Sequence, residues 1–233
     1  MPAFALMGRV AVVAVLAAVA TGCGAWTVSG AGSQMAGQAA AAAPAASSGS
    51  GIDALTQVAR RRYITESRGR VAVQTLHRVA GDPVLQRLLR SANVAATRAY
   101  VEQQFAAVWY HWHVSRLRVL KGSQAVIDVG MPFVVAPSHM ALRGPGGQRL
   151  STLEVSIQDV IGFVRYMHRN YPVDVVVRGQ RPGHVRTSLP AAAHVQLPSR
   201  GSVTIAGHRY LVRSFQETAL GGEPVTAWIL TRG

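Results

Sequence analysis

The chain has 233 residues, of which 24 are basic and 10 acidic, so its formal net charge is +14 at pH 7. Its single cysteine excludes a disulfide framework and a cysteine-rich zinc site. Such a charge would suggest nucleic acid for an intracellular protein, but the sequence has no DNA- or RNA-binding motif and no arginine run longer than residues 60–62.

The first 23 residues are typical of an export signal. Arg9 precedes an unbroken apolar run at 10–20, too short to span a bilayer comfortably, and small residues lead from there to Cys23. The segment 20–23 resembles the bacterial lipobox, although Ala20 stands where leucine is usual. The resemblance implies that the Cys23 thiol is acylated and that the mature protein is held at the extracytoplasmic face of the cell membrane. An uncleaved anchor or a plain secreted protein is the alternative.

Composition divides the remainder into two parts. Residues 24–51 are uncharged and consist mainly of alanine, glycine and serine, which predicts a flexible tether. Residues 52–233 have the length and composition of one domain, and they show no internal repeat.

The domain begins with a helical half. Apolar residues recur at helical spacing from Ile52 to Val79, with one slip at 67–69. Asp82 can cap the next helix and Pro83 can occupy its first turn, so we expect a second helix from there to about residue 110.

From residue 112 onward, apolar residues tend to alternate with polar ones, a spacing of two residues that is typical of strands. A helix is expected at 159–170, with Asp159 as its cap, and turns at 144–147 and 206–207. The expected strands are 113–120, 124–129, 131–136, 151–157, 173–178, 184–189, 202–205, 208–215 and 225–231. This order predicts an α+β fold, with long N-terminal helices followed by an antiparallel sheet with one inserted helix.

The order of elements resembles the extracytoplasmic cache (PAS-like) sensor domains over residues 52–230. The segments that carry the likeness are RLRVLKGSQAVIDVGMPFVVAP, SIQDVIGFVRYMHR and GSVTIAGHRYLVRSFQETALGGEPVTAWIL. The resemblance implies a sheet closed over a ligand pocket and a homodimer formed through the N-terminal helices. Such sensors usually sit between two transmembrane helices that feed an output module. This sequence shows no second apolar segment of spanning length and no output domain, so we expect any signal to pass through another protein.

An aromatic segment, VWYHWH at 108–113, is the first candidate site. His111 and His113 would share one face of a strand, but a metal site lacks a third ligand nearby. The segment either packs the helix end onto the sheet or forms the wall of a ligand pocket, in which Tyr110 and Trp112 would contact the ligand.

Charged residues supply the other candidates. Arg165 and Tyr166 lie on the inserted helix, which borders the pocket in the resembling domains, and an arginine there can bind a carboxylate in bidentate fashion. Solvent exposure is the alternative for both. Asp128 and Arg186 lie in strands, where they either face a pocket or serve in ion pairs; Asp128 would then pair with Arg118 or Arg186.

These observations predict a membrane-anchored, extracytoplasmic ligand-binding lipoprotein of the sensor type, which binds a small molecule or a protein partner. The motifs GxSxG, SxxK and HExxH are missing, so we expect no enzyme and no cofactor. A structural envelope lipoprotein, whose basic surface binds anionic lipid or cell-wall polymer, is the alternative. An envelope hydrolase with a purely spatial catalytic site is the third hypothesis.

Overall fold

The structure is a computed structural model that describes residues 49–233. The expected export signal, Cys23 and residues 24–48 of the expected tether lie outside the described residues. The first helix begins at Gly49, before the expected domain start at residue 52.

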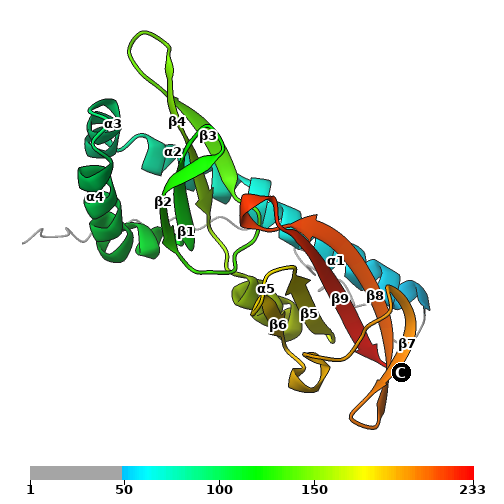
Figure 1. The fold of residues 1–233 in the computed structure, drawn as a ribbon. Coiled ribbons are helices and arrows are strands. Elements are labelled where there is room, and N and C mark those ends of the chain that lie inside the picture. Colours follow the sequence, from blue (N-terminus) through cyan, green and yellow to red (C-terminus); the bar gives the residue numbers. More distant parts are fainter. Residues whose placement is uncertain (1–48) are drawn as a thin grey trace, which may run out of the picture. The chain divides into compact units, whose positions relative to one another are not determined.

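Helices form the N-terminal third of the described chain, before the first strand, as the sequence predicts (Figure 1). The slip at 67–69 falls at Gly69, where the backbone is extended and one helix gives way to the next. These elements are α1 (Gly49–Arg68), α2 (Arg70–Ala80), α3 (Pro83–Arg90), α4 (Val94–Ala107) and the 3₁₀ helix η1 (Trp109–Trp112).

Helix caps explain where α3 and α4 begin. Asp82 Oδ1 accepts hydrogen bonds from the backbone N–H groups of Val84 and Leu85, both at 2.9 Å, so the predicted cap is confirmed. The expectation of one continuous helix over 84–110 is wrong. Ala92 adopts a left-handed backbone conformation, and the Asn93 side chain accepts from the Ala96 N–H and so starts a new helix.

The strands form two antiparallel sheets (Figure 1). The first sheet has the order β2-β1-β4-β3 and contains β1 (Arg116–Lys121), β2 (Gln124–Gly130), β3 (Ser138–Arg143) and β4 (Arg149–Ser156). The second has the order β6-β5-β9-β8-β7 and contains β5 (Asp174–Gly179), β6 (Val185–Thr187), β7 (Arg200–Ile205), β8 (His208–Thr218) and β9 (Pro224–Arg232). Two short 3₁₀ helices, η2 (Pro190–Ala192) and η3 (Leu220–Gly222), lie in connections of the second sheet.

Between the two sheets in sequence comes α5 (Val160–Asn170). Asp159 caps this helix through a 2.8 Å hydrogen bond from the Gly162 N–H, as the sequence predicts. The α+β class and the order of helices before antiparallel strands are therefore confirmed, but the strands divide into two sheets where one was expected.

One expected strand is wrong. Residues 131–136 form only isolated bridges, from Val134 to Asp159 and from Val135 to Ala219. Pro132 and Pro137 lie in and after this segment, and proline has no N–H to donate to a ladder. The strand that follows, β3, was not predicted, because its sequence SHMALR has no β-branched residue.

The two sheets share one arrangement of strands. In each, the first and last strands are central neighbours, the second strand lies outside the first, and the next-to-last lies outside the last. The strands β1, β2, β3 and β4 thus correspond to β5, β6, β8 and β9, while β7 adds an edge. The two sheets therefore repeat an order of strands, although the sequence shows no internal repeat.

Each sheet has its own core. The first packs Leu117 and Leu153 against α2 and the buried Trp109 of η1. The second packs Ile229 and its neighbours against α1 and α5 on one face, and Leu230 and others against the 189–197 segment on the opposite face. Within residues 49–233, no helix combines the length and the apolar character needed to cross a membrane.

Candidate functional site

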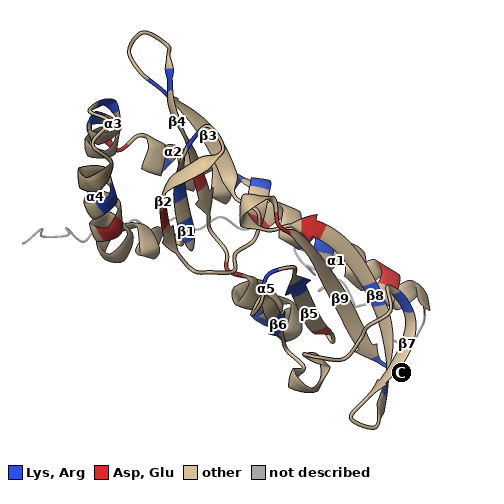
Figure 2. Ribbon diagram, viewed as in Figure 1, with Lys and Arg blue, Asp and Glu red and all other residues tan. Residues whose placement is uncertain are grey.

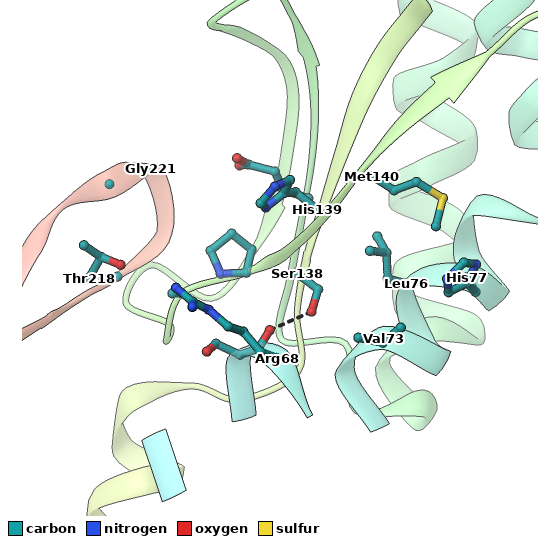
Figure 3. A pocket seen from close by; sticks show the side chains of 15 residues that line it. Arg68, Val73, Leu76, His77, Ser138, His139, Met140, Thr218 and Gly221 are labelled. Carbon is teal, nitrogen blue, oxygen red and sulfur yellow. Dashed lines mark hydrogen bonds between the residues drawn. The ribbon is translucent and has the colours of Figure 1, made fainter. Parts of the chain in front are cut away.

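The largest of the cavities that we describe has a volume of about 590 Å³. It lies where the end of α1, α2, the beginning of β3 and the β8–β9 connection meet, so it combines segments from both sheets (Figure 3). We call it the cleft. Its lining residues are Ser67, Arg68, Val73, Leu76, His77, 136–140, Glu154, Thr218, Ala219, Gly221 and Gly222.

One wall of the cleft is apolar. Leu76 belongs to the core of the first sheet, whereas Val73, on the same helix, is 40% exposed. Met140 of β3 stands beside them and is partly buried (Figure 3). This wall offers apolar surface to a ligand without loosening the core behind it.

Basic side chains also line the cleft. Arg68, the last residue of α1, is exposed and extends toward the end of β8 and the β8–β9 connection, where Thr218 and Gly221 lie (Figure 3). His77 of α2 and His139 of β3 are also exposed at the cleft. Three groups that can carry positive charge therefore surround the space.

The carboxylate in the cleft lining, Glu154, is already paired. In the sheet, Glu154 stands opposite Arg118 on one side and His139 on the other. The Arg118 Nη1 atom lies 3.1 Å from Glu154 Oε2, and Nε lies 3.6 Å from Asp128 Oδ2. Arg116 holds both oxygens of Asp128, at 2.6 and 2.8 Å. Because these cations neutralise the carboxylates, the positive charge of Arg68 is not cancelled by Glu154.

Hydrogen bonds hold the walls of the cleft to one another. The buried Ser138 hydroxyl donates to the Ser67 carbonyl at 2.6 Å, which ties β3 to the end of α1 (Figure 3). The Tyr63 hydroxyl donates to the Thr218 carbonyl at 2.8 Å, which ties α1 to β8. Burial raises the pKa of Tyr63, so this hydroxyl keeps its proton.

The β8–β9 connection is fixed by a buried carboxylate. The Glu223 side chain is 4% exposed and accepts hydrogen bonds from the Arg181 N–H at 3.0 Å and from His184 Nδ1 at 2.8 Å. Although burial alone would raise the pKa of Glu223, these donors and their charges hold it below its ordinary value. The His184 ring stacks on Phe133, with centroids 4.5 Å apart. The loop that borders the cleft is therefore preorganised.

Glycine is required at the tip of this connection. Gly221 has a φ of +76°, and a Cβ atom there would lie 3.2 Å from Arg118 Nη1. A side chain at this position would strain the backbone and press on the arginine that neutralises Glu154.

The structure does not bring the six ligand-binding candidates together. Asp128 forms an ion pair with Arg118, which was one of the two partners expected for it, and not with Arg186. Arg165 is exposed on α5, and Tyr166 lies under the Arg62 guanidinium at 4.2 Å. Arg186, on β6, lies over the Phe133 ring at 5.8 Å.

The aromatic segment packs the helix end onto the first sheet, which is one of the two roles considered for it, and the ligand-contacting role stays a prediction. Trp109 is 1% exposed in the core, and Trp112 packs there beneath the Arg78 guanidinium at 4.9 Å. Tyr110 is 61% exposed and lines a separate cavity of about 400 Å³ with His111 and His113. The segment is a 3₁₀ helix and not a strand, and within residues 49–233 no group of three potential ligands could hold a metal ion.

Sequence reasoning missed the side chains that line the cleft. Arg68, His77, His139 and Glu154 come from a helix end, a second helix and two strands, and their spacing along the chain carries no motif. Only the fold brings them together.

Comparison with known proteins gives structural likeness alone. No known family model matches the chain, and no curated protein matches it significantly. The solved structures that resemble it include the periplasmic domain of LuxQ from Vibrio cholerae, with 10% identity over 77% of this chain and 97% of that one and a TM-score of 0.48. The sensor domain of the V. cholerae histidine kinase DctB has 11% identity over 78% and 98% of the two chains and a TM-score of 0.42.

A third similar structure is the ligand-binding domain of the Pseudomonas fluorescens chemoreceptor CtaA in complex with L-alanine. It has 12% identity over 78% of this chain and 95% of that one, with a TM-score of 0.38. At these identities and TM-scores, the similarities are limited to the general course of the chain.

Proposed function

We propose that the protein is a ligand-binding protein of the sensor type, held at the extracytoplasmic face of the cell membrane by an acylated Cys23, and that it binds a small anionic molecule in the cleft. The observation that carries the proposal is Arg68, whose side chain lines a cavity of about 590 Å³ in which the carboxylate of Glu154 is already paired with Arg118. A cavity of this size is typical of small-molecule sites.

The lining indicates what kind of molecule fits. An exposed arginine binds a carboxylate through two parallel hydrogen bonds, and His77 and His139 offer further hydrogen-bonding groups. The wall formed by Val73, Leu76 and Met140 favours an apolar portion on the same molecule. A carboxylate attached to a small hydrocarbon body therefore suits the cleft.

The proposal is one of binding and not of catalysis. The two serine hydroxyls at the cleft serve the fold, since Ser67 donates to the Ile64 carbonyl at 2.9 Å and Ser138 to the Ser67 carbonyl at 2.6 Å. Neither hydroxyl is hydrogen-bonded to a base that would activate it as a nucleophile.

A thermal-shift screen of the full chain against small carboxylates, at low and high salt, tests the proposal. We expect a compound that raises the melting temperature at both salt concentrations. Arg68→Gln should then weaken its affinity about tenfold or more, because a charge-assisted hydrogen bond is lost. Arg61→Gln is the matched control, since Arg61 is exposed on the same helix outside the cleft and the variant loses the same charge. Equal effects of the two substitutions would refute the proposal.

Surface charge favours a second candidate function. Residues 51–233 carry 23 basic and 10 acidic side chains, and Figure 2 shows basic residues on helices and on both sheets. We propose as the alternative that this surface holds anionic lipid or cell-wall polymer. Stabilisation by polyanions alone, vanishing at high salt, would favour this function over the first.

A further inference from the structure

We infer a second binding site, for a phosphate-type oxyanion, in a cavity of about 400 Å³ at the junction of α1 and α2. We call it the junction cavity. Its polar lining includes Arg62, Arg70, His113 and Gln158. It shares no lining residue with the cleft, which lies at Ser67 and Arg68 of the same junction.

The donors of the junction cavity come from separate parts of the chain. Arg62 belongs to α1 and Arg70 begins α2, while Gln158, whose Nε2 also donates to the Asp159 carbonyl at 3.2 Å, precedes α5. His113 follows η1 in a left-handed conformation, with φ +63°, and its N–H is bound to the Tyr110 carbonyl at 3.0 Å. Donors that surround one space from several directions suit an anion with several acceptor oxygens better than one with two.

Charge in the cavity is positive. Glu66 is the carboxylate among the lining residues; its side chain is 9% exposed and pairs with Arg62, four residues earlier. Burial raises the pKa of Glu66, although Arg62 and His113 oppose the shift. Arg70 is exposed and forms no ion pair among the described residues. An arriving anion would therefore find an uncompensated guanidinium group there.

The backbone adds to what these side chains provide. Gly69 also lines the cavity and occupies the N-cap position of α2. Because glycine has no side chain, Gly69 offers no acceptor to the N–H groups in the first turn of α2. Arg70 and Val71, in this first turn, line the same cavity. Such N–H groups favour a nearby negative charge.

Titration of the full chain with inorganic phosphate, by calorimetry at constant ionic strength, tests the inference. We expect saturable binding that Arg70→Gln weakens about fivefold or more, because one charge-assisted contact is lost. Two matched variants, Arg61→Gln on the exposed face of α1 and Arg68→Gln in the cleft, should each change the affinity less than about twofold. Because Arg70 is exposed, its replacement should leave the melting temperature unchanged, which separates lost binding from lost folding.

Three results would overturn the inference. Equal losses in all three variants would mean that phosphate responds to surface charge in general. A loss confined to Arg68→Gln would place the anion in the cleft, and titration without saturation would mean that no site exists. Phosphatidylglycerol vesicles, added in place of phosphate, distinguish the source of the anion: binding that Arg70→Gln weakens would identify a lipid headgroup.

Discussion

Pairing decides which charged side chains are available for binding. Six of the ten acidic residues form ion pairs with arginine, and two more, Asp82 and Asp159, cap helices. Because arginines outnumber acidic residues, some arginines form no ion pair among the described residues. Arg68 and Arg70 are two of these, and each lines a cavity. The net charge of the sequence does not identify which arginines are unpaired and line a cavity.

The hydroxyl of Ser138 is expected to stabilise the wall of the cleft. Ser138→Ala removes a buried hydrogen bond and leaves the Ser67 carbonyl without that donor, so the free energy of unfolding should fall by about 1–2 kcal/mol. Urea unfolding measures this. Ser202→Ala, at an exposed position of β7, should stay within about 0.5 kcal/mol. Equal effects would mean that the Ser138 contact does not hold the wall.

Glu223 is expected to make stability depend on acid pH. Its pKa in the folded protein lies below its ordinary value, so its stabilising contribution is complete above the unfolded pKa, about 4.3, and is lost as the pH falls through the lower folded pKa. Glu223→Gln should therefore be less stable than wild type at neutral pH, and the difference should narrow in acid.

Melting temperatures measured across this pH range test the expectation. The exposed Glu102 of α4 provides a control, because Glu102→Gln should run parallel to wild type. A Glu223→Gln curve that is also parallel would show that the contacts of the Glu223 carboxylate with Arg181 and His184 contribute nothing to stability.

At the level of elements, the sequence correctly predicted two helix starts and one hairpin turn from local signals. Asp82 and Asp159 act as the caps that the sequence indicated, and 206–207 form the turn of a hairpin. The prediction failed at Asn93, because the alanine-rich helical pattern continues through the break. It failed again over 131–136, where a strand-like composition is overridden by prolines and by contacts with distant segments.

The junction of α1 and α2 depends on Gly69. A Cβ atom at this position would collide with the Thr65 carbonyl oxygen, a backbone atom that can yield only if α1 shifts. We expect Gly69→Ala to lower the free energy of unfolding by more than about 1 kcal/mol and to weaken binding in both cavities. Gly49→Ala is the control, since its Cβ would meet nothing closer than 3.8 Å. Urea unfolding that is identical for the two variants would contradict this role of Gly69.

At the level of the whole molecule, the cleft exists because segments of the two sheets meet there. The first sheet supplies His139 and Glu154, strand β8 of the second supplies Thr218, and α1 supplies Arg68. The sequence predicted the fold class, because the spacing of apolar residues indicates helices and strands from neighbouring residues alone. It did not predict the cleft, because none of these side chains lies near the others along the chain.

Hydrogen exchange of the full chain, with and without the carboxylate that stabilises it most, tests the central claim most directly. The account predicts slower exchange in three segments at once: 67–77, 136–140 and 218–222. Arg68→Gln should reduce this protection at the same ligand concentration while leaving the exchange of the free protein unchanged. Protection confined to η1 and α5, where Tyr110 and Tyr166 lie, would contradict the assignment of the cleft as the binding site.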